Sequence, residues 1–177
     1  MSASKLVKPA MEYKESYLEA LKEFHAEGRY DFLKVDELSE NFPAFLEDLN
    51  EGRSHLHNPF ADWVEPVPET NLWMVKENMF IGSFIIRHRL NWHLEKLGGH
   101  INFTIRPTMR GKGFGKKLLQ KGIPFACYLG IDRALLTTSP DNEAAIRTIE
   151  FCGGEFADET PSTEQFPARK RYWLDCS

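Results

Sequence analysis

The sequence predicts an α/β (α+β) fold in one domain that spans residues 1–177. Runs with β-strand character alternate along the chain with segments whose apolar residues recur at helical spacing. A strand, a glycine-rich turn and a helix start follow one another between His100 and Leu119. The chain of 177 residues is also long enough for one domain with a sizeable core.

An edge strand and two helices are expected in the first part of the chain. Lys5 to Lys8 alternates as a short strand does, and Met11 to Ala26 has apolar residues at helical spacing. Asn41 or Ser39 is expected to cap a second helix, which ends before Gly52.

Acidic residues cluster around this second helix. A solvated helix face is the simpler interpretation. The alternative is a negatively charged rim that attracts a cationic amine. The residues concerned are Asp36, Glu37, Glu40, Glu47, Asp48 and Glu51.

A long loop and a β-hairpin are expected next. Residues 55–70 contain three prolines, which exclude long regular structure. His55 and His57 lie in this loop, but no third ligand has a spacing suited to a metal. Residues 71–76 and 80–89 are two β-prone runs separated by a short turn, which predicts a hairpin.

The rest of the chain predicts strands and helices in alternation. Leu90 to Leu97 is amphipathic and is expected to loop out before the strand at residues 100–105. The helix after the glycine-rich turn contains Pro124, which predicts a distortion near residues 120–124. A buried strand is expected at Ala134–Thr138, and the last strands are expected around Phe156 and Tyr172–Leu174. Between them, Ser139 to Asn142 is expected to open a helix. The residues that this helix is expected to bury are Ala144, Ala145, Ile146, Ile149 and Phe151.

The glycine-rich turn has the composition of an anion cradle. Glycines let the backbone approach a ligand closely, and the first amides of a helix have no internal partner. The glycines are Gly111, Gly113 and Gly115, and the flanking cations are Arg110, Lys112, Lys116 and Lys117. This combination favours a polyanion, most simply a diphosphate.

The spacing excludes two common phosphate motifs. The dinucleotide fingerprint requires a third glycine where Lys116 or Leu118 stands. The nucleotide P-loop requires a glycine where Arg110 stands and a serine or threonine where Lys117 stands.

Composition bounds the class of protein. The net charge of −4 argues against a general nucleic-acid binder. No apolar run approaches the roughly 18 residues of a membrane span, and the first residues do not resemble a signal peptide. Cys127, Cys152 and Cys176 are widely spaced, which fits free thiols in a reducing cytoplasm and not a zinc site.

Two motifs together resemble the GNAT N-acetyltransferase superfamily. The pattern Arg110-x-x-Gly113-x-Gly115 is similar to its acyl-coenzyme A signature R/Q-x-x-G-x-G/A. A lead-in of the form V-x-P-x-x-R-G is matched by Ile105, Pro107, Arg110 and Gly111. A second signature is matched by Asn142, Ala145 and Gly153. The resemblance covers roughly residues 71–174.

This resemblance implies a mixed, mostly antiparallel sheet flanked by helices, with splayed fourth and fifth strands and acetyl-CoA in the gap. The backbone of Phe103, Thr104 and Ile105 would hold the pantetheine arm. The loop residues Arg110, Gly111, Lys112, Gly113, Phe114, Gly115 and Lys116 would hold the diphosphate. Asn142 would reach the arm or a water beside it, and it can also serve as a helix N-cap.

The implied reaction is direct attack of a primary amine on the acetyl thioester, with no metal. An alkylammonium has a pKa of about 10.4 and needs a base before it can attack. The base candidates are His100, His88 and Glu95, whereas Cys152 has no adjacent base and is a weaker candidate for a covalent nucleophile. Ile149 stands where many family members have a tyrosine general acid.

Two other functions stay open at this point. One is an acyl-CoA-binding regulatory module without turnover, which the isoleucine at position 149 would allow. The other is a protein that binds nucleotide phosphates with the same loop. The expected partner is an amine of a small molecule or peptide, with no nucleic acid and no membrane, and a homodimer is one option for the oligomeric state.

Overall fold

The structure is a computed structural model that describes residues 3–53 and 65–176. These residues form two antiparallel sheets, with strand orders β1-β2-β3-β4 and β5-β7-β6. The strands are β1 Lys5–Val7, β2 Glu69–Lys76, β3 Met79–Arg87, β4 Ile101–Ile105, β5 Arg133–Thr138, β6 Glu155–Thr160 and β7 Arg169–Asp175. The mixed α/β fold class expected from the sequence is confirmed.

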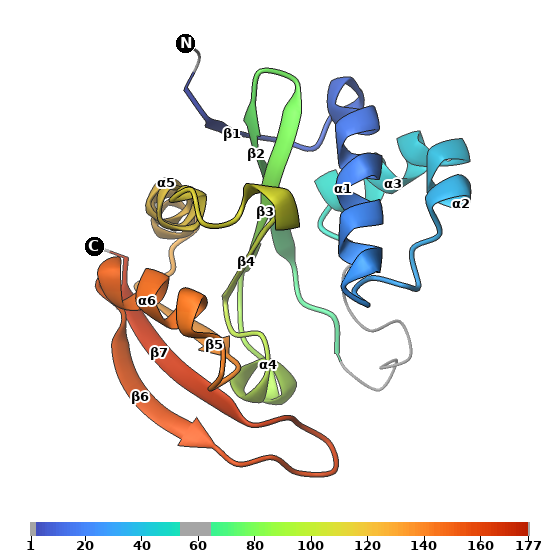
Figure 1. Ribbon diagram of the computed structural model, residues 1–177. Helices are drawn as coiled ribbons and strands as arrows, with labels where there is room; N and C mark the ends of the chain where they lie inside the picture. The colour runs from blue at the N-terminus through green and yellow to red at the C-terminus, as the bar shows by residue number, and fades with distance from the viewer. Residues whose placement is uncertain (1–2, 54–64, 177) are drawn as a thin grey trace.

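Helices cover both faces of the four-stranded sheet (Figure 1). Figure 1 shows the first three helices together on one side of the β2–β3 hairpin and α5 on the other side. The helices are α1 Lys14–Ala26, α2 Val35–Glu40, α3 Phe42–Asn50, α4 Trp92–Lys96, α5 Phe114–Tyr128 and α6 Glu143–Phe151, and short 3-10 helices lie at Met11–Tyr13 and Pro107–Met109.

The alternation of side chains along the hairpin produces two separate cores. On the face covered by the first three helices, the Tyr17 ring stacks on Trp73 at a centroid distance of 4.7 Å, and Phe80 packs edge-on against both. On the opposite face, Phe84 packs with Leu118 of α5 in a core that extends to β5, β7 and α6. Burial of both faces explains why residues 72–75 of β2 and most of β3 are apolar.

Three local expectations need correction in the first half. Asn41 does not cap the second predicted helix, because its side-chain amide donates to the Glu37 carbonyl at the end of α2. Helix α2 itself was not expected. Met79 does not belong to the hairpin turn, because it pairs with Lys76 and leaves a two-residue turn in which Glu77 has a φ of +56°.

Two further expectations need correction in the second half, and one stays a prediction. The amphipathic stretch before β4 is helical as α4, whose N-cap Asn91 accepts a hydrogen bond from the Leu94 amide at 2.8 Å. Helix α5 continues through Pro124 to Tyr128, so the proline does not end it, and the expected distortion near residues 120–124 stays a prediction. In α6, Ala144 and Phe151 are exposed, whereas Ile149 is buried as expected.

The long loop expected at residues 55–70 is described only from residue 65 onward, and β2 already begins at Glu69. His55 and His57 lie outside the described residues.

Candidate active site

The two sheets separate between β4 and β5. Among residues 3–53 and 65–176, strand β4 pairs with β3 alone and β5 with β7 alone, so each leaves one edge without a strand partner there. The two edges meet near their starts, where the His100 amide donates to the Leu135 carbonyl at 2.8 Å and the Leu135 amide donates to His100 Nδ1 at 2.9 Å. Gly99 permits this approach, because a Cβ there would lie 2.3 Å from the Leu135 carbonyl oxygen. The predicted splay is therefore present, with its closed end at His100.

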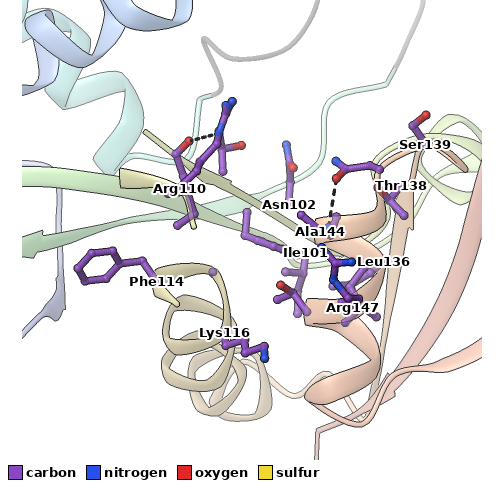
Figure 2. A pocket seen from close by; sticks show the side chains of 18 of the residues that line it. Ile101, Asn102, Arg110, Phe114, Lys116, Leu136, Thr138, Ser139, Ala144 and Arg147 are labelled. Atoms are coloured by element: carbon purple, nitrogen blue, oxygen red, sulfur yellow. Dashed lines mark hydrogen bonds between the residues drawn. The ribbon is translucent and has the colours of Figure 1, made fainter. Parts of the chain in front are cut away.

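A cleft of about 790 Å³ occupies the splay. Its walls come from all of β4, the glycine-rich loop and the start of α5, the end of β5, and α6. Figure 2 shows Ile101 and Leu136 at the floor, with Lys116 on α5 and Arg147 on α6 at the side of the two helices. A cleft of this size is ample for a small-molecule or cofactor site.

The glycine-rich loop presents bare backbone to this cleft. Gly111 and Gly113 have φ values of +75° and +83°, and apart from the adjoining residues no atom of the described chain lies within 4 Å of where a Cβ would be. The amides of residues 111–116 donate to no acceptor within the described part of the chain. These amides include the first turn of α5, where the helix dipole is positive. The cradle therefore fits a diphosphate.

The cations of the loop have different roles. Lys116 lines the cleft together with Arg147, which sequence reasoning did not identify. Lys112 is exposed and lies outside the cleft lining. Arg110 lines the cleft, but its guanidinium is held by both oxygens of Glu27, with Nη2 to Oε2 at 3.1 Å, and its Nε donates to the Ile105 carbonyl. Arg110 therefore ties the loop to the end of α1.

A second ion pair fixes the loop to α1. Arg106 is buried and donates to Glu23 from Nε at 2.7 Å, while the other Glu23 oxygen accepts from the amide and hydroxyl of Thr108. Burial alone would raise the pKa of Glu23, but the hydrogen bonds from Arg106 and Thr108 outweigh it and lower that pKa. The loop is thus positioned from outside by two carboxylates of α1.

The second motif shapes the wall opposite the loop. The Asn142 side chain accepts from the Ala145 amide at 3.1 Å, so its expected N-cap role is confirmed, and it also lines the cleft. Ile149 lines the cleft too and offers no proton. Thr148, one position earlier, lies close to Gly115 across the cleft.

The predicted base candidates lie away from the cleft lining. His100 uses Nδ1 to hold Leu135, and burial lowers its pKa, so its placement favours a structural role. His88 Nε2 lies 2.7 Å from the Thr70 hydroxyl, and Glu95 is exposed on α4. Among the described residues that line the cleft there is no histidine, and Glu27 is the one carboxylate.

The acidic cluster of the first half does not reach this cleft. Asp48 and Glu51 pair with Arg53, and none of the six acidic residues is part of the cleft wall. Their placement favours the solvated-face interpretation over a rim that attracts a cation.

Sequence reasoning missed the wall residues contributed by distant elements. They have no motif of their own, since each reaches the cleft through tertiary packing. The polar ones include Arg147, Glu27, Arg29, Thr137, Ser139 and Arg169.

The described residues contain neither a helix suited to span a membrane nor a cluster of metal-binding side chains. None of their helices combines the length and apolar character needed to cross a bilayer. No group of three or more histidine, cysteine, aspartate or glutamate side chains is arranged to hold a metal ion in residues 3–53 and 65–176.

Comparison with known proteins gives one family. A model of the acetyltransferase (GNAT) family matches residues 31–153. A mycothiol acetyltransferase of Corynebacterium aurimucosum is 27% identical over 103 residues, which make up 56% of this chain and 34% of that protein. The chain therefore spans about a third of the length of this curated relative.

Solved structures with the same fold cover nearly the whole chain. RimJ of Mycobacterium smegmatis in complex with CoA-disulfide has a TM-score of 0.69 at 12% identity, covering 98% of this chain and 82% of that one. The microcin C7 self-immunity acetyltransferase MccE, in complex with acetyl-CoA and AMP, has a TM-score of 0.67 at 14% identity, covering 97% and 92%. A spermidine N-acetyltransferase SpeG chimera from Vibrio cholerae and hSSAT has a TM-score of 0.63 at 17% identity, covering 99% and 96%. At these identities the likeness is one of fold.

Proposed function

The chain belongs to the acetyltransferase (GNAT) family, and from this premise we propose that it transfers an acetyl group from acetyl-CoA to a primary amine of a small molecule or peptide. The observation that supports this best is the cleft between two unpaired strand edges, with the open glycine-rich loop in its wall. An extended polar chain fits between such edges, because backbone groups there are available for hydrogen bonds.

The residues present fit the coenzyme. The amides of residues 111–116 would hold the diphosphate, with Lys116 and Arg147 neutralising phosphate charge. The free edge of β4, from Phe103 to Ile105, would hold the pantetheine arm, and Asn142 stands at the opposite wall. Arg110 contributes to the loop's shape through Glu27 and not as a free cation.

When bound, acetyl-CoA supplies the acetyl group as a reactive thioester. The chain's own contribution is to hold two reactants in one cleft and to orient the amine, which can account for much of a rate enhancement. Backbone amides on the free edge of β4 are suited to stabilise developing oxyanion charge. Since no histidine lines the described cleft wall and Glu27 is engaged by Arg110, we expect water in the cleft to carry the amine proton away.

A regulatory module that binds acyl-CoA without turnover is the second candidate. Ile149 in the cleft wall favours it, because isoleucine cannot protonate a leaving thiolate. The penalty is limited, since a thiol has a pKa of about 8.5 and its thiolate leaves readily. We therefore place the enzyme first.

A turnover screen tests the proposal. The full chain is incubated with acetyl-CoA and polyamines, amino acids, aminoglycosides and peptides, and free thiol and acetylated product are measured. We expect release of thiol with at least one amine class. Tight acetyl-CoA binding without any product would favour the regulatory module, and thermal stabilisation by ATP but not by coenzyme A would overturn the coenzyme assignment.

A further inference from the structure

Arg169 is a cation of the cleft wall that the coenzyme site leaves unexplained. It begins β7, beside the end of β5, and lines the cleft. Its Nη2 donates to the Thr137 carbonyl at 2.8 Å and to the Thr137 hydroxyl at 3.1 Å, and its Nε lies 3.3 Å from the same hydroxyl. The guanidinium is therefore held in one orientation by a single neighbouring residue.

Arg169 has no carboxylate partner in the described part of the chain. No aspartate or glutamate oxygen lies within 4.0 Å of it there, and its Nη1 meets no acceptor among those residues. Arg171, two positions along the same strand, shows the contrast, because Asp158 accepts from both its Nε and its Nη2 at 2.6 Å. Burial lowers the pKa of Arg169, but a guanidinium stays charged in proteins. A half-buried cation thus faces the cleft with donors to spare.

Strand alternation places Arg169 on the face opposite α5 and α6. Tyr172 and Leu174 of β7 pack in the core with these helices, so the odd-numbered residues of this strand point to the other face. The same alternation puts Asn102 of β4 on that other face, and Figure 2 shows its side chain pointing away from α5 and α6. The cleft therefore has two sides, with the diphosphate cradle on one and Arg169 on the other.

We propose that Arg169 binds a carboxylate of the acetyl acceptor, so that the acceptor is an amino acid or another small amine that also carries a carboxylate. This inference rests on the proposed function, because the acceptor must enter from the side that the coenzyme does not fill. Since Thr137 takes the donors on Nε and Nη2, Nη1 is the nitrogen that can donate to a carboxylate oxygen, and a hydrogen bond between two charged groups is stronger than a neutral one. The charges of the described cleft wall agree, since Arg29 and Arg169 stand on the wall and the one carboxylate, Glu27, is already taken by Arg110.

Matched acceptor pairs test the inference. Each pair is an amino acid and its carboxamide, and kcat/KM is measured for both with wild type, Arg169→Gln, Arg169→Lys and Lys170→Gln. Lys170→Gln removes the same charge from the next residue, which lies outside the cleft lining. We expect wild type and Lys170→Gln to prefer the carboxylate, and we expect Arg169→Gln to lose about ten- to a hundredfold of that preference. Arg169→Lys should keep part of it, because it keeps the charge but not the planar guanidinium that Thr137 holds in one orientation.

Calorimetry provides a second readout that does not need turnover. The best amino acid is titrated into each variant loaded with coenzyme A, and we expect its affinity to fall in Arg169→Gln in parallel with the kinetic preference. Thermal melts of the variants show that each is folded.

The outcomes separate this inference from the function on which it rests. Two results would overturn the role of Arg169 and leave the acetyltransferase function intact. One is turnover of polyamines or neutral amines with no preference for a carboxylate. The other is a higher kcat/KM for an amine that carries a phosphate than for the amino acids. Equal losses for both members of a pair in Arg169→Gln would also overturn it. If a carboxylate binds in a manner that depends on Arg169 but no product forms, the site is supported and the transfer reaction is contradicted. If no amine binds or is turned over, both the carboxylate site and the acetyltransferase function are contradicted.

Discussion

Gly113 and Gly130 share one backbone conformation but lie at opposite ends of α5. Their φ values are +83° and +87°, and a Cβ at either position would meet no described residue within 4 Å other than the adjoining ones. Gly113 lines the cleft as the N-cap of the helix, whereas Gly130 follows its C-terminus outside the cleft lining. The same substitution at the two positions therefore distinguishes the effect of backbone strain from a direct effect on a ligand in the cleft.

We expect Gly113→Asp to raise the dissociation constant for acetyl-CoA about tenfold or more, because a carboxylate in the cradle repels the diphosphate. Gly130→Asp carries the same charge change and a similar strain, and we expect it to leave the affinity near the wild-type value. Calorimetric titration of both variants checks this. Equal weakening by the two substitutions would mean that the loop has no special role.

His100 is expected to make the protein less stable as the pH falls below neutral. Burial lowers its pKa in the folded state, while the unfolded chain keeps a value of about 6.5. Below that pH, His100 binds a proton more readily in the unfolded state than in the folded state, so the free energy of unfolding decreases as the pH falls. Protonation of Nδ1 would also remove the acceptor for the Leu135 amide.

His100→Asn tests this pH dependence, because an asparagine oxygen can replace Nδ1 as acceptor but does not titrate. We expect the drop in urea midpoint between pH 7 and pH 5 to be smaller in this variant than in wild type. His100→Ala should instead cost about 1–3 kcal/mol at pH 7, since it leaves the Leu135 amide unpaired. An identical drop in wild type and His100→Asn would contradict the assignment.

At the scale of elements, Arg106 joins α1 to the start of the glycine-rich loop. It is buried, it contacts Glu23 from Nη2 at 2.6 Å, and it also donates to the Phe80 carbonyl of β3. Removing one partner of a buried pair leaves the other charge without compensation. We expect Arg106→Ala to lower the free energy of unfolding by about 3 kcal/mol.

Arg133→Ala is the matched control for Arg106→Ala. Its pair with Asp175 is more than half exposed on both sides, at 54% and 65%, so its loss should cost less than about 1 kcal/mol. Urea denaturation of both variants measures the difference. Similar losses in the two would show that the Arg106 contacts do not anchor the loop.

The crossing of α5 over β3 depends on Gly122. A Cβ at this position would lie 2.2 Å from Cζ of the Phe84 ring. We expect Gly122→Ala to cost about 1–3 kcal/mol through overpacking, and Phe84→Leu in the same chain to recover part of that loss. The free energies of unfolding of wild type, the two single variants and the double variant form a double-mutant cycle. If the losses of the two single variants simply add in the double variant, the two residues are not in contact.

At the scale of the whole molecule, signals local in sequence predicted much of the fold. Alternation identified β4, helical spacing identified α1, and the N-cap at Asn142 followed from its place before an apolar helix. The positive-φ glycines of the cradle were also readable, since their spacing is a backbone requirement and needs no knowledge of tertiary packing.

Contacts between distant residues were not predictable from local pattern. Arg110 and Glu27 are 83 positions apart, and their pairing turns an expected phosphate ligand into a structural tie. Thr137 and Arg169 are 32 positions apart, and the antiparallel pairing of β5 with β7 brings them together at the cleft. Pro124 alone could not show whether its helix would end there, and the surrounding packing lets α5 continue to Tyr128.

The whole molecule is built around a cleft that passes between the two sheets. One side offers bare loop amides and two cations, and the other offers Arg169 and the end of α1. The closed end at His100 limits how far an extended ligand can enter. The molecule is therefore organised so that an acyl carrier and an acceptor can meet from opposite faces.

A crystal structure of the protein with acetyl-CoA tests the central claim most directly. We expect the diphosphate to lie against the amides of residues 111–116 and the pantetheine arm to run along the free edge of β4. Coenzyme bound at another surface, or bound here with its phosphates away from those amides, would contradict the proposed site.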